Sequence, residues 1–574
     1  MHSGFGLLRP KRHDTFGTAK WMQPHEIEAS GLNNESNFPF MGVVKWWNRQ
    51  GKQEFSIYAN QIGHQITVAP TRTGKGTSHI VPNLIFWPHS VLVLDIKGEN
   101  YAITGRRRME MGQEVLVFAP FMKDTDKWNP IESIRVEPST PNAFAVEEEN
   151  ASYLTKLLMR EDKQARDPYW NSAAFSVIEA FVLFVATTEL REGVSESPRP
   201  LERTMGEVYR LLTQNHDDFI ATLDQMALPD ERRIVQQGAN VLKRMMISER
   251  QFTSVLTTAI DHLKAWNTER IRSVTKENTF SFKKLRDGNT TLYLIIPPEM
   301  LDAYRPIVRA FVGWALRELR LSFETAQHDG EPPVLFLLDE FPSLGRMEPL
   351  QDGLTYLAGY GIRLWLFAQN LDQLKEHYPN NWQTFIANCA VRSFFGVSDF
   401  ETAKLISEMA GKATVENRTL GESFSQSEGI GHTSGKSSGT SSTWGSSNSD
   451  GKSSTSSFSH TTNSGDSSST SWNTSRSVSL SGSVTNVARA LINPDEVMRL
   501  QANEQIIFLQ GLPPLKALKR PYYEHEAWVR HADTWRGDIV ERIAVHATQQ
   551  IPHNPTAELP TMKQTKKELV ERPR

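Results

Sequence analysis

The stretch "QITVAPTRTGKGTSHIVPNLIFW", Gln65 to Trp87, decides the fold. A short apolar run, "QITVA", leads into "PTRTGKGT" and then into a segment that can begin as a helix, which is the strand–loop–helix order of a phosphate-binding loop. The usual loop is G-x-x-x-x-G-K-[ST], but here Ala69 replaces the first glycine and Gly76 stands where the magnesium-binding hydroxyl belongs. From this stretch alone, a nucleotide site and a glycine-rich turn with a solvated lysine both remain open.

A phosphate cradle at this position would use the backbone N–H groups of the loop to wrap a β-phosphate. The Lys75 ammonium would reach the β- and γ-phosphates as a point charge. The predicted nucleotide-binding residues are Thr71, Arg72, Thr73, Gly74, Lys75, Gly76 and Thr77.

Composition limits the class of protein. A chain of 574 residues is long enough for two or more domains. Its 63 Lys and Arg against 66 Asp and Glu leave a net charge of −3, so any nucleic-acid contact must be local. The single cysteine, Cys389, excludes a disulfide framework and a cysteine zinc site, and the 16 histidines show no zinc-binding spacing.

Apolar runs separated by helix-length amphipathic segments begin at the quoted stretch. Uninterrupted apolar runs of this length indicate buried parallel strands, so the pattern predicts an α/β fold with a mainly parallel sheet covered on both faces. The runs are "QITVA" (65–69), "SVLVLD" (90–95), "EVLVFA" (114–119), "TLYLII" (291–296), "PVLFLLD" (333–339), "IRLWLFAQ" (362–369), "AVRSFFG" (390–396) and "QIIFLQG" (505–511).

Changes in pattern divide the chain into segments. Helical periodicity without strand-like runs predicts an all-α domain inserted in the α/β domain. A Ser-, Thr- and Gly-rich segment buries too little apolar area to offset its ordering entropy, so we expect a flexible insertion there. The predicted segments are an arm and hairpin (1–60), the nucleotide-binding domain (61–170 and 289–525), the all-α domain (171–288), the flexible insertion (421–485) and a polar tail (526–574).

Two further groups are predicted to join the loop. "PVLFLLDEF" ends an apolar run in adjacent carboxylates, Asp339 and Glu340, and ligands bind at the carboxyl ends of parallel strands. One carboxylate would hold the shell of a Mg²⁺ ion and the other would polarise the water that attacks the γ-phosphate. Gln369 ends the next run, where its amide would lie near the γ-phosphate and sense hydrolysis or position water.

Several motifs occur together in an order that resembles a known family. "APTRTGKG", "IVPNLIFWPHSVLVLDIKGE", "KWNPI", "DPYWNSAA", "LLDEFPSLGRM", "LFAQNLDQL" and "IFLQGLPPLKALKRPYY" are similar to the cytoplasmic part of TraG/TraD-type coupling proteins, the ATPases of conjugation and type IV secretion systems. The resemblance covers about residues 17 to 525 apart from the serine-rich insertion.

The resemblance implies a RecA-like P-loop NTPase domain with an inserted all-α domain, assembled as a homo-hexamer that uses ATP and Mg²⁺. It assigns Lys75 to phosphate binding, Asp339 to Mg²⁺, Glu340 to water activation and Gln369 to nucleotide sensing. Because these proteins tolerate a GKG ending, either Thr77 or a water completes the magnesium shell. In a ring, Arg392 or Arg363 would act as an arginine finger toward a neighbouring subunit.

The resemblance also implies partners: single-stranded DNA carrying a relaxase, and channel proteins at the bacterial inner membrane. Members of the family usually carry N-terminal transmembrane helices, whereas this sequence starts near their post-membrane segment. We expect a cytoplasmic protein at the inner face of that membrane, and a soluble relative, an anchor on another polypeptide and a truncated anchor all remain open.

Two motifs keep two interpretations each. Asp95, Lys97 and Glu99 in "LDIKGEN" fit a strand-end ion pair and helix cap as well as a place beside the nucleotide. The run Arg106–Arg108 fits a phosphate contact as well as a solvated face. At the level of function, a DNA-translocating ATPase leads, ahead of a protein-only secretion coupler and a non-hydrolysing recruitment scaffold.

Overall fold

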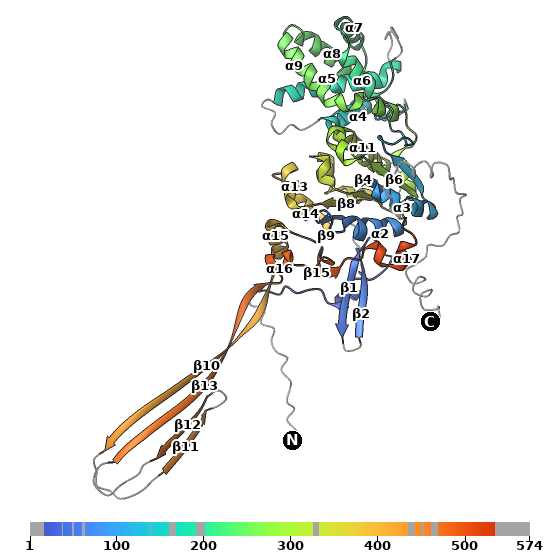
Figure 1. Ribbon diagram of the computed structural model, residues 1–574. Coiled ribbons are helices and arrows are strands. Elements are labelled where there is room, and N and C mark those ends of the chain that lie inside the picture. The colour runs from blue at the N-terminus through green and yellow to red at the C-terminus, as the bar shows by residue number, and fades with distance from the viewer. Residues whose placement is uncertain are drawn as a thin grey trace, which may run out of the picture. The chain divides into compact units, whose positions relative to one another are not determined.

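The computed structural model describes residues 17–36, 38–48, 51–59, 63–137, 139–159, 168–190, 201–324, 332–433, 442–449, 453–460 and 469–533. The chain divides into two compact units, Trp21–Lys404 with Pro494–Arg574, and Met1–Lys20 with Leu405–Asn493. The first unit holds a large sheet and the second holds a small four-stranded sheet (Figure 1).

The large sheet has the strand order β2-β1-β15-β14-β9-β3-β8-β7-β4-β6-β5 in the described residues. Strands from β9 to β5 are parallel to their neighbours: β3 (His64–Val68), β4 (Val91–Asp95), β5 (Glu114–Phe118), β6 (Thr290–Ile295), β7 (Val334–Leu338), β8 (Ile362–Ala368) and β9 (Cys389–Phe394). Antiparallel pairs add β1 (Phe40–Asn48), β2 (Gly51–Tyr58), β14 (Glu504–Leu509) and β15 (Leu515–Leu518). The predicted mainly parallel sheet is confirmed.

Helices cover both faces of the parallel strands (Figure 1). On one face lie α2 (Val81–Phe86) and α3 (Glu99–Glu110), where the Tyr101 ring centroid is 5.1 Å from that of Tyr293. On the other face α11 (Pro298–Glu324) stacks Phe311 on Phe118, with ring centroids 4.7 Å apart. Every residue of β4 and β7 is buried, which explains why these strands are apolar without interruption.

Other helices and turns lie outside the inserted helical region. They are α1 (Pro24–Ala29), α4 (Ala143–Leu158), α12 (Glu348–Gly353), α13 (Leu371–His377), α14 (Trp382–Ala387), α15 (Phe400–Ala410), α16 (Pro494–Met498) and α17 (Glu526–Val529), with 3₁₀ turns η5 (Phe341–Leu344), η6 (Leu357–Tyr360) and η7 (Tyr522–Glu524).

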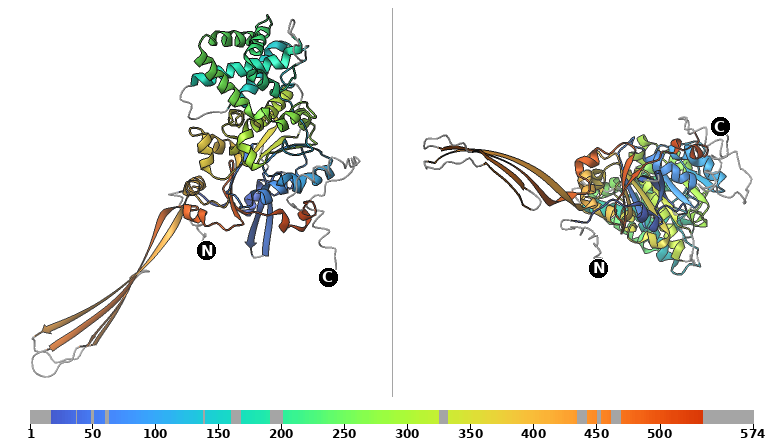
Figure 2. Two further views of the ribbon diagram at one scale, coloured as in Figure 1. Left: turned by 45° about the horizontal axis from the view of Figure 1, so that its top comes forward. Right: turned by 90° about the horizontal axis from the view of Figure 1, so that it is seen from below.

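Between β5 and β6, the described residues from Pro168 to Asp287 hold helices and no strand, in the range where we predict an all-α domain. They gather at the end of the first unit opposite the β1–β2 hairpin (Figures 1 and 2). A buried ion pair of 2.7 Å between Arg232 Nε and Glu147 Oε2 ties them to α4. The helices are α5 (Pro168–Thr187), η2 (Thr188–Leu190), α6 (Met205–Thr213), α7 (His216–Met226), α8 (Arg233–Met245), α9 (Glu249–Leu263), η3 (Lys264–Asn267), α10 (Glu269–Val274) and η4 (Phe282–Asp287).

Helix α5 is long and apolar enough to cross a membrane by length and composition alone, over Tyr169–Thr187. In the structure 61% of that segment is buried inside the protein. Because α5 packs against α4, α6, α8 and α9, its apolar character is that of a helix at the centre of a helical bundle.

The second unit has strands in the segment where we predict a flexible insertion, and the flexibility of that segment stays a prediction. The segment 421–485 lies largely in an antiparallel sheet of order β10-β13-β12-β11, and β10 pairs with β13 without interruption from Lys412–Ala490 to Thr433–Ser469. Its strands are β10 (Lys412–Thr433), β11 (Ser442–Ser449), β12 (Ser453–His460) and β13 (Ser469–Ala490). The prediction counted apolar burial, whereas a ladder of this kind is held by backbone N–H and C=O groups that every residue carries.

The two predicted end segments also change. The hairpin of the 1–60 arm joins the large sheet through β15, but Ala19 N donates to the Lys412 carbonyl at 3.0 Å within the second unit. The segment 526–574 is not a polar tail from its start, because Trp528 is 1% exposed and its ring lies 5.1 Å from that of Phe40. Residues from 534 onward lie outside the described part of the chain.

A buried hydrogen-bond network fixes the helix that follows the glycine-rich loop. His79 is fully buried on η1 (Gly76–Ile80), and its Nε2 lies 2.9 Å from Gln505 Oε1 on β14. Burial lowers the pKa of His79 to about 4, so the imidazole is neutral at pH 7. The Trp365 indole donates to Thr67 Oγ1, which leaves the Thr67 hydroxyl to donate to His79 Nδ1 at 3.4 Å. His79 therefore carries its proton on Nε2 and donates it to Gln505.

Gln505 completes the network from the antiparallel side of the sheet. Its Oε1 also accepts from Ser393 Oγ on β9 at 3.1 Å, and its Nε2 donates to the Met41 carbonyl on β1 at 2.6 Å. Four elements are thereby joined through one buried amide.

We expect Gln505→Leu to lower the free energy of unfolding by about 2 to 4 kcal/mol, because it leaves the buried polar partners of the amide unsatisfied. Chemical denaturation followed by circular dichroism measures the change. Gln501→Leu, at an exposed position shortly before Gln505 in the sequence, is the control and should change stability by less than about 0.5 kcal/mol. Equal losses in the two variants would contradict the role given to the network.

Candidate active site

The loop predicted to bind phosphate, Thr71–Thr77, connects β3 to η1 at the carboxyl end of the strand. Arg72 and Gly74 have φ of 61° and 95°, so the backbone turns sharply at both residues. The Thr73 hydroxyl donates to the Pro70 carbonyl at 2.6 Å. The helix begins as a π-helical turn, a feature often found at functional sites.

The Lys75 ammonium lies within this loop. Its side chain is buried, and its Nζ donates to the Ala69 carbonyl at 2.9 Å. Burial lowers the pKa of Lys75, while the nearby charges of Asp339 and Glu340 raise it. The structure thus brings together the lysine and the acid pair that the sequence pattern predicts.

Asp339 follows β7 directly and faces this lysine. Its Oδ1 is buried and has no hydrogen-bond partner among the described residues. Burial raises the pKa of Asp339 to about 6, against the lowering effect of Lys75. Because hard divalent cations bind carboxylate oxygens of this kind, the residues present fit a Mg²⁺ ion held by Asp339.

Glu340 and Gln369 meet at the ends of two adjacent strands. Gln369 Nε2, just after β8, donates to Glu340 Oε1 at 2.8 Å. Glu340 has φ of 54°, a left-handed conformation that costs free energy for a residue with a side chain. The Glu340 charge acts on Lys75, so the carboxylate lies near the loop, where a water-activating group would be needed.

Two hydroxyl groups, those of Thr77 and Ser78, lie close to Gly74 where the loop enters the helix. Thr77 Oγ1 donates to the Gly74 carbonyl at 3.3 Å. A Cβ built on Gly74 would lie 3.3 Å from Thr77 Oγ1 and 3.4 Å from Ser78 Oγ. Ser78 is buried and was missed in the sequence, where only its position directly after the motif could have indicated it. A Cβ on Gly76 would meet no atom within 4 Å, so the hydroxyl of a standard loop would find open space.

Two motifs with open interpretations now have defined contacts. Asp95 Oδ2 accepts from the Tyr101 backbone N–H at 2.8 Å in the first turn of α3, and burial raises the pKa of Asp95 to about 7. Within Arg106–Arg108, Arg108 is fully buried and donates to Thr291 Oγ1 at 2.7 Å. Arg108 therefore supports the sheet and neither contacts phosphate nor forms a solvated face.

The predicted arginine fingers lie away from this group of residues. Val391 and Ser393 of β9 face α2, so Arg392 points to the opposite face of the sheet. Arg392 Nε is buried with no partner among the described residues. Arg363 is at the amino end of β8, opposite the loop. Neither position supports a role for these arginines at the site of their own subunit. That Arg392 acts as an arginine finger toward a neighbouring subunit stays a prediction.

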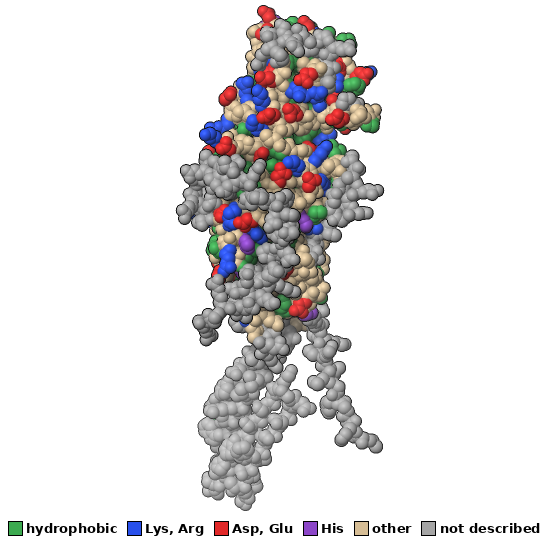
Figure 3. Space-filling view, turned by 90° about the vertical axis from the view of Figure 1, so that its right-hand side faces the viewer, with side chains coloured by type: hydrophobic (Ala, Val, Ile, Leu, Met, Phe, Trp, Pro, Cys, Tyr) green, Lys and Arg blue, Asp and Glu red, His purple; other side chains and the backbone are tan. Residues whose placement is uncertain are grey.

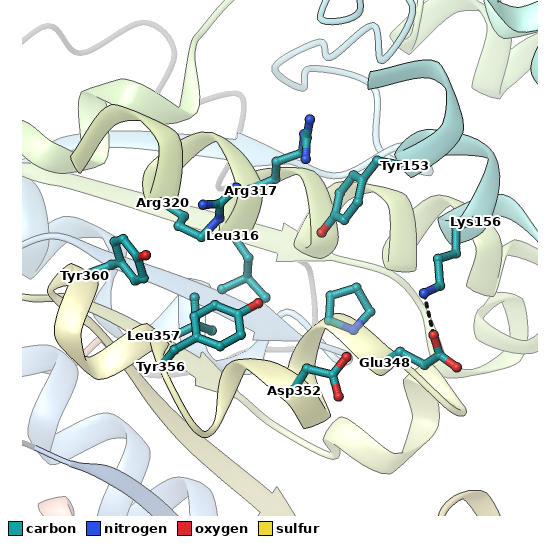
Figure 4. Close-up of a pocket in the computed structure, with 11 residues that line it drawn as sticks. Tyr153, Lys156, Leu316, Arg317, Arg320, Glu348, Asp352, Tyr356, Leu357 and Tyr360 are labelled. Carbon is teal, nitrogen blue, oxygen red and sulfur yellow. Dashed lines mark ion pairs between the residues drawn. The ribbon is translucent and has the colours of Figure 1, made fainter. Parts of the chain in front are cut away.

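A pocket of about 410 Å³ lies apart from the loop, among α4, α11, α12 and η6 (Figure 4). Lys156 and Glu348 form an ion pair of 2.6 Å at one end. The Arg317 guanidinium lies over the Tyr153 ring, 4.8 Å from its centroid. None of the lining residues belongs to the phosphate-binding loop or the acid pair, so this pocket is not the site described above.

The loop, the acid pair and the glutamine lie at one edge of a mainly parallel sheet, which is the arrangement typical of the P-loop NTPase fold. A family model described as "Type IV secretory system Conjugative DNA transfer" matches residues 15–443 and 452–563. The chain belongs to this family.

Curated relatives agree with this assignment. Conjugal transfer protein TraG of Escherichia coli is 27% identical over 442 residues, covering 70% of this chain and 65% of TraG. Protein VirD4 of Rhizobium radiobacter is 28% identical over 550 residues, covering 93% of this chain and 67% of VirD4. The chain therefore spans about two thirds of the length of these relatives.

Solved structures give the same fold. Plasmid coupling protein TrwB in complex with ADP and Mg²⁺ has a TM-score of 0.55 at 13% identity, covering 90% of this chain and 97% of TrwB. The unbound monoclinic form of TrwBdeltaN70 has a TM-score of 0.51 at 14% identity, covering 80% of this chain and 84% of that one. The RecA-like fold is confirmed by this likeness.

Glycines around the loop should differ sharply in tolerance. A Cβ on Gly396, where φ is +63°, would lie 2.5 Å from Thr73 Cγ2, so Gly396→Ala should lower the free energy of unfolding by about 2 to 4 kcal/mol. Gly76→Ala should leave stability unchanged or raise it by up to about 1 kcal/mol. Urea denaturation of both variants measures this, and similar losses would contradict the packing described.

We expect Asp339→Asn to stabilise the metal-free protein at neutral pH. Folding raises the pKa of Asp339 from 3.8 to about 6, because burial favours the protonated carboxyl. The folded state therefore gains its full benefit from Asp339 below pH 3.8, where the carboxyl is protonated, and loses that benefit as the pH rises through 6. The variant should exceed the wild type by about 2 to 3 kcal/mol at pH 7.5 and by less than about 1 kcal/mol near pH 4. Denaturation in Mg²⁺-free buffer measures both, with the exposed Asp352→Asn as the control. A pH-independent difference would contradict the prediction.

Proposed function

We propose that this protein is an ATP-hydrolysing coupling protein that moves single-stranded DNA toward a type IV secretion channel. The observation that carries the proposal is the meeting of Lys75, Asp339, Glu340 and Gln369 at one sheet edge, in a chain of the conjugative DNA transfer family. A ligand-binding edge equipped with a cation, two carboxylates and an amide suits phosphoryl transfer to water.

The residues divide the chemistry among them. Backbone N–H groups of Gly74 to Thr77 and the Lys75 ammonium bind and orient the phosphates. Glu340 accepts a proton from the attacking water, and the Gln369 amide holds the Glu340 carboxylate and exchanges this bond when the γ-phosphate leaves. Asp339, with Thr77 or a water, would hold Mg²⁺, which when bound neutralises charge on the phosphate oxygens.

The wider setting of the proposal rests on the family. We infer a homo-hexamer at the cytoplasmic face of the bacterial inner membrane, receiving a relaxase–DNA substrate and contacting channel proteins. Its DNA contacts would be independent of sequence, because a translocase must release every base. Figure 3 shows one face of the molecule, where Lys and Arg side chains lie among Asp and Glu on the described residues, so any attraction of this face to DNA would be local.

Hydrolysis with and without single-stranded DNA tests the proposal. DNA should stimulate ATP turnover by the wild type, and Glu340→Gln should lower kcat by about 10² to 10⁴-fold because the general base is lost. ADP affinity and thermal stability should remain near wild-type values. Glu376→Gln, at an exposed acid on α13, is the matched control and should keep its activity.

Other outcomes select the alternatives. Hydrolysis that Glu340→Gln abolishes but DNA does not affect favours a protein-only secretion coupler. Absence of hydrolysis in an assembled, nucleotide-bound ring favours a recruitment scaffold. Turnover that survives in Glu340→Gln would remove the assigned role of Glu340.

A further inference from the structure

A second lysine contacts the phosphate-binding loop from a distant part of the chain. Lys519, directly after β15, is 8% exposed, and its Nζ donates to the Thr73 carbonyl within the loop. The same ammonium lies over the Phe395 ring, 4.3 Å from the centroid. The long separation in sequence, more than four hundred residues, explains why no motif pairs these groups.

The Lys519 ammonium lies close to Gly74 in the loop. A Cβ built on Gly74 would lie 3.8 Å from Lys519 Nζ, 3.3 Å from Thr77 Oγ1 and 3.4 Å from Ser78 Oγ. An ammonium and two hydroxyls therefore converge on the start of the helix, where backbone N–H groups face phosphate.

The electrostatic setting of Lys519 differs from that of Lys75. Lys75 has the carboxylates of Asp339 and Glu340 near it, whereas no carboxylate pairs with Lys519 among the described residues. Burial alone lowers the pKa of Lys519, to about 8, so most molecules carry the charge at pH 7. A buried cation without a counter-ion is costly, and an anion arriving at the loop would offset that cost.

We propose that Lys519 is a second phosphate-binding cation of the nucleotide site, placed at the α/β-phosphate end of the loop while Lys75 serves the β/γ end. This inference rests on the proposed function, since it requires that the loop binds a nucleotide. In the absence of nucleotide, the carbonyl of Thr73 and the face of Phe395 hold the ammonium in place. Lys519 thereby couples β15, the last strand in sequence, to nucleotide binding.

The test separates charge from structure by comparing two variants with the wild type. Lys519→Gln keeps an N–H donor for the Thr73 carbonyl and loses the charge, whereas Lys519→Arg keeps the charge. We expect Lys519→Gln to weaken ADP binding by about 10- to 100-fold in calorimetry, because a charge-assisted contact is lost, and Lys519→Arg to weaken it less. Thermal unfolding without nucleotide should stay within a few degrees of the wild type for both.

A control and an uncharged ligand complete the design. Lys516→Met, at an exposed lysine of β15 that pairs with Glu504 at 2.9 Å, should bind ADP as the wild type does. Adenosine, which carries no phosphate, should bind all the proteins alike. Unchanged ADP affinity in a folded Lys519→Gln would overturn this inference alone, as would equal weakening of ADP and adenosine. A wild type that binds no ADP would instead overturn the proposed function.

Discussion

The buried amide of Gln505 is the constraint on which the position of the phosphate-binding loop depends. It accepts the Nε2 proton of His79, one turn into the helix that follows the loop, and it donates to β1 while it accepts from β9. All these groups are removed from water, so each would cost free energy if left unpaired. The helix is therefore held to the antiparallel side of the sheet as well as to β3. The antiparallel strands therefore extend the sheet and also fix the helix after the loop, and through that helix they orient the N–H groups of the loop.

Strain is concentrated where the chain leaves the parallel strands. Three described residues other than glycine have positive φ, and two of them, Arg72 and Glu340, follow β3 and β7 at the ligand-binding edge. Each such conformation costs of order 1 kcal/mol or more and persists only where surrounding contacts enforce it. For Glu340 the enforcing contact includes the hydrogen bond from Gln369. The strained backbone at Glu340 and the hydrogen bond from Gln369 thus act together to position the Glu340 carboxylate.

Some of this could be predicted from sequence and some could not, for identifiable physical reasons. The parallel strands and the ligand edge follow from uninterrupted apolar runs and from the rule that such strands end together. This is why the sequence predicts that Lys75, Asp339, Glu340 and Gln369 meet at one edge, and their roles there stay predictions. Burial on both faces is a local property that composition reports. The contacts of Ser78 and Lys519 are long-range packing, which no local pattern encodes. The serine-rich strands were missed because the prediction counted side chains, whereas their pairing uses the backbone.

The charges at the ligand edge are arranged for a partner that the protein alone does not supply. Burial raises the pKa of both Asp95 and Asp339, and the nearby Asp339 carboxylate raises the pKa of Asp95 further. The free protein therefore holds two crowded acids at the ligand edge and, at the loop, the Lys519 ammonium, which has no carboxylate partner among the described residues. Apolar residues at these positions would avoid the free-energy cost of burying charged groups, as they do in the rest of the core. This site nevertheless has charged residues. A divalent cation beside the acids and a phosphate chain beside the lysines would offset both at once, because the two ligands are themselves of opposite charge. Binding the two together would then be more favourable than binding either alone, so the proposed function predicts electrostatic selectivity for a metal–nucleotide complex.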